Sequence, residues 1–337
     1  MLSVSSVVKM VLIFMNRRHL ITLLVCISIA ACQTKTPPPP ASTPTNTPSR
    51  LIPTPRYDIQ PSATQTPPAS VTFTPKVLPT QTKSTAQTSA STTAIETPLS
   101  NEWKSLPVLP EPDESIGEIY KKGQSLGNDP NSFSIFGDCQ SRPADFFGVF
   151  ETDPLLVESL TPELHETVEH FNGSFNRESP TSQDGTTPGA LLWDQWHRGQ
   201  FGCTFAETPV DCELRIHRPS FVIIQIGTHF ESRNTEYLRK IITQLINEGI
   251  VPILATKADN RELDDRVNRD MALLADEFNV PLWNFWASLS DLPNRGLYVM
   301  KGREEQGAVY LNEEAQEIHR ITGLEALNIV WRVAVKK

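Results

Sequence analysis

The chain has 337 residues, of which 39% are hydrophobic, and its formal net charge at pH 7 is −9. The charge is unevenly divided: residues 1–105 hold nine Lys or Arg against three Asp or Glu, a balance of +6, whereas residues 106–337 hold 21 against 36, a balance of −15. A domain this acidic repels phosphate backbones, so nucleic acid is excluded as an expected partner.

The N-terminal region has the pattern of a secretory signal peptide. Arg17 and Arg18 precede an apolar run over residues 20–31, which is shorter than the roughly 18 residues that a membrane span needs. The run ends in small residues, and Ala31 stands directly before Cys32, a residue suited to carry a lipid after cleavage. We therefore predict a lipid-modified Cys32 and an extracytoplasmic, cell-surface lipoprotein that contacts the membrane through this anchor.

Two more expectations concern the N-terminal part of the chain. Residues 1–14 fit no signal, so Met15, or else Met10, is expected to be the true start of a signal peptide that ends at residue 31. Residues 32–105 are dominated by Thr, Pro, Ser and Ala, and such a segment buries too little apolar surface to offset its ordering entropy. We expect a disordered, extended spacer between the lipid and the folded domain.

Residues 106–337 suffice for one domain with a substantial core. Apolar residues at helical spacing lie over 237–246 and over 263–278, and Thr322 with Glu325 forms a capping-box pattern that predicts the start of the last helix. Four apolar, β-rich runs alternate with these patterns, over residues 132–136, 221–226, 250–255 and 280–285. This alternation predicts a flavodoxin-like, three-layer α/β/α sandwich with a parallel sheet, which we expect to be a monomer.

The cysteines of the domain have separate expected roles. Cys203 and Cys212 bracket a short loop in an oxidising compartment, which predicts a disulfide with Cα atoms about 4.4–6.8 Å apart. Closing so small a loop would stabilise the fold by about 2–3 kcal/mol. Cys139 is then left as an unpaired thiol.

Unusual residues gather where the predicted strands end. Gly137-Asp138-Cys139 follows the first strand, Gly227-Thr228-His229 follows the second, and Thr256-Lys257-Ala258-Asp259-Asn260 follows the third. The carboxyl ends of parallel strands meet at one edge of a sheet, which is where such folds bind their ligands. The sequence therefore predicts the functional site at this edge.

The order of these blocks resembles the SGNH, or GDSL, hydrolase family of esterases and lipases, over most of residues 130–335. In that family a nucleophile stands in Gly-Asp-Ser after the first strand, a place that Cys139 occupies here. The resemblance implies an oxyanion glycine, for which Gly185 is the best match and Gly173 a rival. It also implies a Gly-x-Asn-Asp block, which Gly227 and His229 would occupy.

The family's last block, Asp-x-x-His before the C-terminal helix, can be placed in two ways. In one, Tyr310-Leu311-Asn312 stands where His-Leu-Thr would be, with a helix after Asn312. In the other, His319 is the histidine, with Gln316 three residues before it in place of the Asp. The Tyr310 alternative fits the local pattern better and would leave the site without a general base.

Two functions follow as expectations. In the first, Cys139 attacks an acyl ester of a glycan or lipid, His319 or His229 moves the proton, and Gly185 helps to hold the oxyanion. In the second, Cys139 is a small buried side chain, and the domain is a catalytically degenerate binding or structural module. No grouping of His, Cys, Asp and Glu has the spacing of a metal site, so we expect neither metal nor cofactor.

Overall fold

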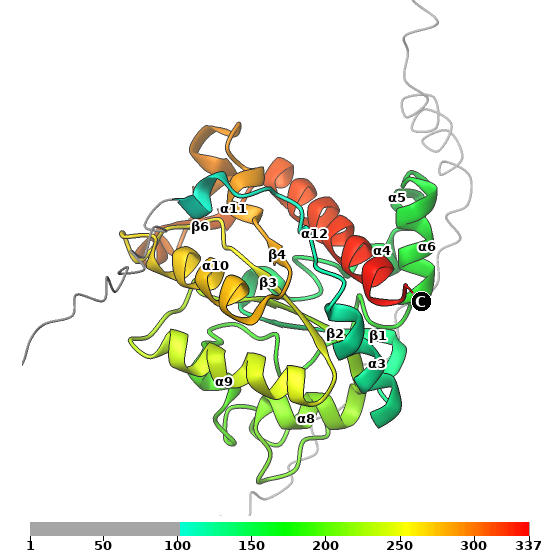
Figure 1. Ribbon diagram of the computed structural model, residues 1–337. Helices are drawn as coiled ribbons and strands as arrows, with labels where there is room; N and C mark the ends of the chain where they lie inside the picture. Colours follow the sequence, from blue (N-terminus) through cyan, green and yellow to red (C-terminus); the bar gives the residue numbers. More distant parts are fainter. Residues whose placement is uncertain (1–101, 337) are drawn as a thin grey trace, which may run out of the picture. The chain divides into compact units, whose positions relative to one another are not determined.

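The computed structural model describes residues 102–336 (Figure 1). The predicted signal peptide, Cys32 and nearly all of the tether lie outside the described residues. Within residues 102–336, no helix combines the length and apolar character that crossing a membrane requires.

A four-stranded parallel sheet forms the centre of the domain, in the order β1-β2-β3-β4. The strands are β1 (Asp129–Gly137), β2 (Pro219–Gln225), β3 (Val251–Ala255) and β4 (Leu282–Trp283). Ser182, which lies between β1 and β2 in the sequence, forms a single parallel bridge to Gly137, whose other side pairs with β2. Counting this bridge as a vestigial strand gives the flavodoxin-like order 2-1-3-4-5.

Helices cover both faces of the sheet, because successive strand residues point to opposite faces. In β2, Phe221 and Ile223 pack into one core, and Val222 and Ile224 into the other. The helices that cover the first core are α3 (Ile116–Leu126), α6 (Pro162–His170) and α12 (Glu313–Ala334). The helices that cover the second core are α8 (Pro209–His217), α9 (Asn234–Asn247) and α10 (Arg266–Phe278). The predicted three-layer α/β fold is thus confirmed (Figure 1).

Shorter elements connect these layers. The short α-helices are α4 (Val149–Thr152), α5 (Pro154–Glu158), α7 (Pro188–Leu191) and α11 (Phe285–Ser288). The 3-10 turns are η1 (Glu102–Ser105), η2 (Cys139–Ser141), η3 (Pro293–Gly296) and η4 (Glu304–Gln306). An antiparallel hairpin of β5 (Leu297–Val299) and β6 (Ala308–Leu311) leads directly into α12. The sequence did not predict this hairpin, because strands of three or four residues show too little alternation.

The last helix begins earlier than its predicted start at Thr322. Asn312 caps α12, since its side chain accepts a hydrogen bond from the backbone N–H of Ala315 at 2.9 Å. Thr322 lies inside the helix and donates its hydroxyl to Ile318 O at 2.7 Å. The capping-box prediction was wrong because a Thr can bond the preceding turn of its own helix as well as cap a new one.

The second predicted helix, over residues 263–278, and the fourth strand also differ from the prediction. Leu263, expected on the buried face of a helix, is 87% exposed and has a left-handed backbone with φ +70°. The fourth strand contains only Leu282 and Trp283, and Phe285 already belongs to α11. In both places an apolar residue lies in a connecting segment, which periodicity alone does not distinguish from an element.

The packed part of the chain begins a few residues before the predicted boundary at 106. Trp103 is fully buried, although its segment reads as tether. Asn284, directly after β4, donates its side-chain amide to Trp103 O at 2.9 Å and to Leu106 O at 3.1 Å. The backbone N–H of Asn284 also bonds Val108 O at 2.9 Å, so residues 103–108 line the outer edge of β4.

The predicted disulfide is confirmed. Cys203 and Cys212 are bonded, with Cα atoms 5.2 Å apart. Cys212 is fully buried on α8, whereas Cys203 lies in the loop that precedes this helix. The bond therefore attaches the loop to α8, and Cys139 is the free cysteine of the described residues.

Candidate functional site

The site begins at the end of β1, where the Asp138 carboxylate joins two strand ends. One carboxylate oxygen accepts from the backbone N–H groups of Gly227, at 3.1 Å, and Thr228, at 2.9 Å. The other accepts from Gln140 N at 3.3 Å. Burial raises the pKa of Asp138, while these hydrogen bonds oppose the shift. Because Gly227 N–H is bonded to Asp138, it is not available to an oxyanion in the pocket.

Gly227 is required by close packing at this strand end. Its φ is +149°, and a Cβ there would lie 2.4 Å from Val267 Cγ1. No side chain fits at that distance, so only glycine lets the loop after β2 pass α10. Gly227 thus lies at the predicted edge of the sheet, and its close packing against α10 explains why a glycine is needed there.

A buried ionic cluster lies beside this strand end, formed by Lys257, Asp259, Glu262 and Thr228. Lys257 Nζ lies 2.8 Å from Asp259 Oδ1 and 2.5 Å from Glu262 Oε2, and Thr228 Oγ1 donates to Asp259 Oδ2 at 3.1 Å. Lys257 is only 3% exposed. Buried charges are tolerated when they are paired in this way, so the cluster fixes the loops after β2 and β3 to each other.

Cys139 faces a pocket of about 230 Å³ at the carboxyl edge of the sheet, which we call the Cys139 pocket. The residue begins η2 and is half-buried. The charged and aromatic residues that line the pocket are Arg142, Asp145, Asp184, Tyr298, Arg303 and Tyr310. Cys139 was expected to face a cleft shared with Gly185, His229 and either Tyr310 or His319, and of these four residues Tyr310 lines this pocket.

The surroundings of Cys139 oppose thiolate formation. Burial, together with the nearby carboxylates Asp138, Asp184 and Asp259, raises the pKa of the thiol from 9.0 to about 12. The sulfur lies 4.0 Å from Asp138 Oδ1, and among residues 102–336 no imidazole makes a hydrogen bond to it. At neutral pH this thiol is protonated, which is the opposite of what an activated cysteine nucleophile needs.

His319 lies in the core and not in the Cys139 pocket. Its ring is fully buried, stacks on Phe146 at a centroid distance of 4.0 Å and packs beside Trp283 and Phe285. Nε2 donates to Gln225 Oε1 at 2.6 Å, and Nδ1 has no hydrogen-bond partner within the described part of the chain. Burial lowers the pKa of His319 well below its usual value. The possible Cys139–His319 pair is not formed, because Gln225 and the aromatic rings hold the imidazole.

Tyr310 occupies the pocket side of β6, as the first placement of the last block implied. Its hydroxyl donates to Gln306 Oε1 and accepts from Arg303 Nη1 at 3.4 Å. Asn312 then caps α12, which matches a helix that starts after Asn312. A phenol is too weak a base at neutral pH to deprotonate a thiol, so Tyr310 cannot replace a catalytic histidine.

The predicted oxyanion residues are not gathered around Cys139. Gly185 has a left-handed backbone with φ +77° and follows the pocket residue Asp184, but it does not line the Cys139 pocket, and a Cβ built on it would lie 4.0 Å from the ring of Trp196. Gly173, the rival, is exposed and donates its N–H to Glu151 Oε1 at 2.6 Å. His229 is half-buried and lies 3.5 Å from Arg261 Nη1, outside the residues that line the Cys139 pocket.

The sequence did not single out most of the residues that shape the pocket. Arg142 and Asp184 form an ion pair at 3.2 Å, and Arg303 extends from the hairpin loop between β5 and β6. Arg142 follows Cys139 by three residues, so its position after the first strand was a usable signal. No comparable signal marked Arg303, because the hairpin itself was not predicted. No group of three or more His, Cys, Asp or Glu in residues 102–336 is arranged to hold a metal ion.

Comparison with known proteins yields little beyond the fold. No protein-family model matches the chain, and no curated protein matches it. Among solved structures, it is similar to a GDSL-like lipase from Bacteroides thetaiotaomicron, with 13% sequence identity and a TM-score of 0.38 over 64% of this chain and 98% of that one. A likeness of this size supports no inference about residues or activity, which rest on the contacts described above.

Proposed function

We propose that this domain is a catalytically degenerate SGNH-like module that binds a glycan in the Cys139 pocket. The observation that carries the proposal is the state of Cys139: its pKa is raised to about 12, and no imidazole of the described residues is bonded to it. Thiol attack on an ester needs a thiolate and an acid that serves the leaving group. With His319 buried and bonded to Gln225, no imidazole of the described residues is placed to form the thiolate.

The lining of the pocket favours a neutral, polar ligand. Arg142 and Arg303 are balanced by Asp145 and Asp184, so the pocket carries no formal excess of charge. The Tyr298 and Tyr310 rings supply flat apolar faces with polar edges, a combination that suits the faces and hydroxyl groups of a sugar. At about 230 Å³ the pocket is below the usual range for drug-sized ligands and suits a single sugar ring.

A lipid acyl chain fits the same pocket less well. Met300 and Leu311 are the aliphatic residues of its lining, and four charged side chains stand close to them. An acyl chain would have to remove water from these charges without forming hydrogen bonds to them. The balance of polar and apolar groups therefore favours a glycan over a lipid.

The predicted anchor would place this module at the cell surface. A lipid on Cys32 and an extended tether that ends before the packed residue Trp103 would hold the domain away from the membrane. We expect Cys32→Ser to release the chain from the membrane fraction or to leave it unprocessed. Normal processing with full membrane retention would contradict the anchor.

The function is tested by titration calorimetry and an ester assay on the full-length chain in detergent. We expect saturable binding of a monosaccharide, weakened at least tenfold in Arg142→Ala, because that guanidinium is a principal donor of the pocket. We also expect hydrolysis of p-nitrophenyl acetate no faster than that by Cys139→Ala. Ester turnover that disappears in Cys139→Ala would overturn the proposal and establish an enzyme.

A further inference from the structure

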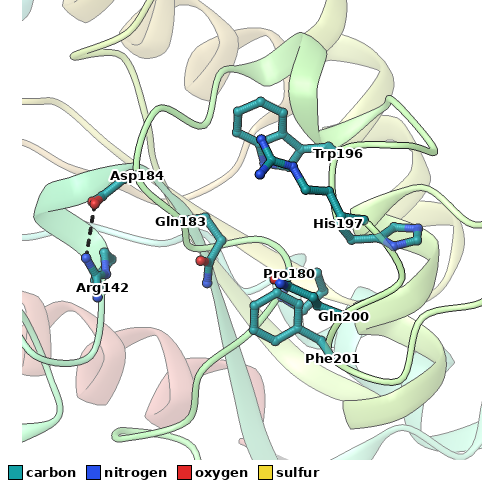
Figure 2. Close-up of a pocket in the computed structure, with 9 residues that line it drawn as sticks. Arg142, Pro180, Gln183, Asp184, Trp196, His197, Gln200 and Phe201 are labelled. Atoms are coloured by element: carbon teal, nitrogen blue, oxygen red, sulfur yellow. Dashed lines mark hydrogen bonds and ion pairs between the residues drawn. The ribbon is translucent and has the colours of Figure 1, made fainter. Parts of the chain in front are cut away.

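A second pocket adjoins the Cys139 pocket and shares two of its residues. It has a volume of about 260 Å³, and Arg142 and Asp184 line both pockets. In Figure 2 the Arg142–Asp184 pair lies on one side of the second pocket, Trp196, Gln200 and Phe201 lie on the other, and Gln183 lies between them. The ion pair is therefore the boundary between two neighbouring cavities.

The far wall of the second pocket is aromatic. Trp196 and Phe201 are half-buried, and both line the cavity. Gln183 donates its amide N–H to Ser179 O at 2.8 Å, which leaves its side-chain carbonyl as an acceptor for a ligand hydroxyl. Aromatic faces with convergent amide groups suit a pyranose ring, whose C–H face stacks while its hydroxyl groups form hydrogen bonds.

The loop between α7 and α8, which carries Trp196 and Phe201, has an unusual backbone. Arg198 and Phe201 adopt left-handed conformations, with φ +51° and +59°, beside Gly199 and Gly202, with φ +69° and +77°. A side chain in this region brings its Cβ too close to the following carbonyl oxygen, so non-glycine residues adopt it at a cost in free energy. Such strain persists where the surrounding structure imposes it, and it tends to gather at binding sites.

Several bonds hold the loop in this conformation. Cys203 is bonded to Cys212 on α8, and Arg215 of the same helix donates to Gly202 O at 3.0 Å. His197, only 4% exposed, bonds Glu207 O through Nε2 at 2.9 Å and accepts the N–H of Gly199 through Nδ1 at 2.9 Å. The aromatic wall is thus positioned before any ligand arrives, which reduces the entropy cost of binding.

The Arg142–Asp184 pair lies between the two cavities and remains partly solvent-accessible. The Arg142 side chain is 33% exposed and that of Asp184 is 60% exposed, so both keep polar atoms accessible to a ligand. Only one guanidinium nitrogen, Nη1, contacts Asp184, and a guanidinium has five N–H donors. A sugar in either cavity can therefore contact the same pair.

We infer that the two cavities are adjoining subsites of one cleft, and that the ligand is an oligosaccharide of at least two sugar units. One unit occupies the Cys139 pocket, and the next stacks on Trp196 and Phe201. The inference rests on the proposed function, which requires only the first subsite. It adds a chain-length requirement and assigns a role to the loop closed by the Cys203–Cys212 disulfide.

Chain-length dependence is the test. Titration calorimetry on the full-length chain in detergent compares monomers and tetramers of the cello-, chito-, xylo- and manno-oligosaccharide series. In the series that binds, we expect the tetramer to bind at least tenfold more tightly than the monomer. Trp196→Ala should bring this ratio close to one. Trp193→Ala is the matched control, because Trp193 is 53% exposed on the same loop and does not line the cleft.

A second pair of variants tests the loop. The double variant Cys203→Ser, Cys212→Ser should lower the ratio of tetramer to monomer affinity, whereas Trp196→Tyr should keep most of it. Melting temperatures within a few degrees of the unsubstituted chain show that Trp196→Ala remains folded. A ratio that Trp196→Ala leaves unchanged overturns the inference and leaves the proposed function intact. Absence of binding to every monomer and tetramer overturns both.

Discussion

The buried ionic cluster and the Cys139 pocket lie at the same edge of the sheet, but their charged side chains differ in how far they are paired and exposed to solvent. In the cluster, Lys257 bonds two carboxylates, and all three charged groups are less than 10% exposed. In the pocket, the Arg142–Asp184 pair is partly accessible to solvent, with side chains 33% and 60% exposed. The cluster satisfies its own charges and so stabilises loops, whereas the pocket keeps polar atoms that a ligand can reach. Position at the strand ends alone therefore does not identify a binding group.

This difference predicts how much the free energy of unfolding falls when one charged residue is removed from the cluster or from the pocket. Removing one member of a buried ion pair leaves an uncompensated charge in a poorly solvated site, at a cost of about 3–5 kcal/mol. An exposed pair contributes about 0–1 kcal/mol, because water replaces the lost partner. Substitutions in the cluster should thus act on stability, and substitutions in the pocket should act on binding.

The largest expected effect comes from Lys257→Met. It leaves Asp259 and Glu262 buried without their cation, so we expect the free energy of unfolding to fall by about 3–5 kcal/mol. Urea denaturation measures the change. Lys240→Met, which removes an exposed pair with Glu236, is the control and should cost less than about 1 kcal/mol. Equal effects of the two substitutions would contradict the contrast.

His319→Ala is expected to be nearly as damaging. The substitution leaves a cavity among Phe146, Trp283 and Phe285 and removes the hydrogen-bond partner of Gln225, which together cost about 3 kcal/mol. Thermal unfolding should show the loss. Glycan affinity of the folded fraction should remain within a few-fold. A variant with native stability but altered binding would instead place His319 in the site.

Stability should fall in mild acid because of buried histidines. Burial lowers the pKa of His217 to about 4, and burial also lowers that of His319. Below pH about 6.5 the unfolded chain binds protons that the folded chain does not, so the free energy of unfolding decreases as pH falls from about 6.5 toward 4. Urea denaturation at pH 7.5 and 5.0 measures the slope. His217→Gln should reduce this slope.

The last prediction concerns the labelling rate of Cys139 and involves no change in stability. This rate reports directly on the protonation of the thiol in the pocket. A thiol pKa of about 12 in place of 9.0 lowers the thiolate fraction at pH 8 about a thousandfold, and the higher intrinsic nucleophilicity of this thiolate recovers part of the lost rate. We expect iodoacetamide at pH 8 to label Cys139 at least about 30-fold more slowly in the folded chain than in urea. Mass spectrometry measures both rates. Rapid labelling of the folded chain would reveal a base near the sulfur and favour an enzyme.

The sequence predicted the sheet well and the site only in part. The second and third strands are mostly apolar runs, and the first combines Phe133, Ile135 and Phe136 with serines; the ends of the first two lead into Cys139 and Gly227 at one edge. The state of the site depends on contacts between distant residues. His319 belongs to the core because Phe146, far away in the sequence, stacks on it. No spacing rule could show that, nor the meeting of Arg142 with Asp184.

The vestigial strand at Ser182 has a further consequence for the outer edge of β1. Beyond that single bridge, side chains occupy the edge: Thr181 Oγ1 donates to Ile135 O at 2.9 Å, and Ser174 Oγ accepts from Phe133 N at 3.3 Å. An incoming β-strand would have to displace these bonds before it could pair. Since unpaired strand edges are templates for aggregation, this edge is protected against joining another copy of the chain. The irregular segment therefore covers this strand edge and also supplies Gln183 and Asp184, which line the second pocket.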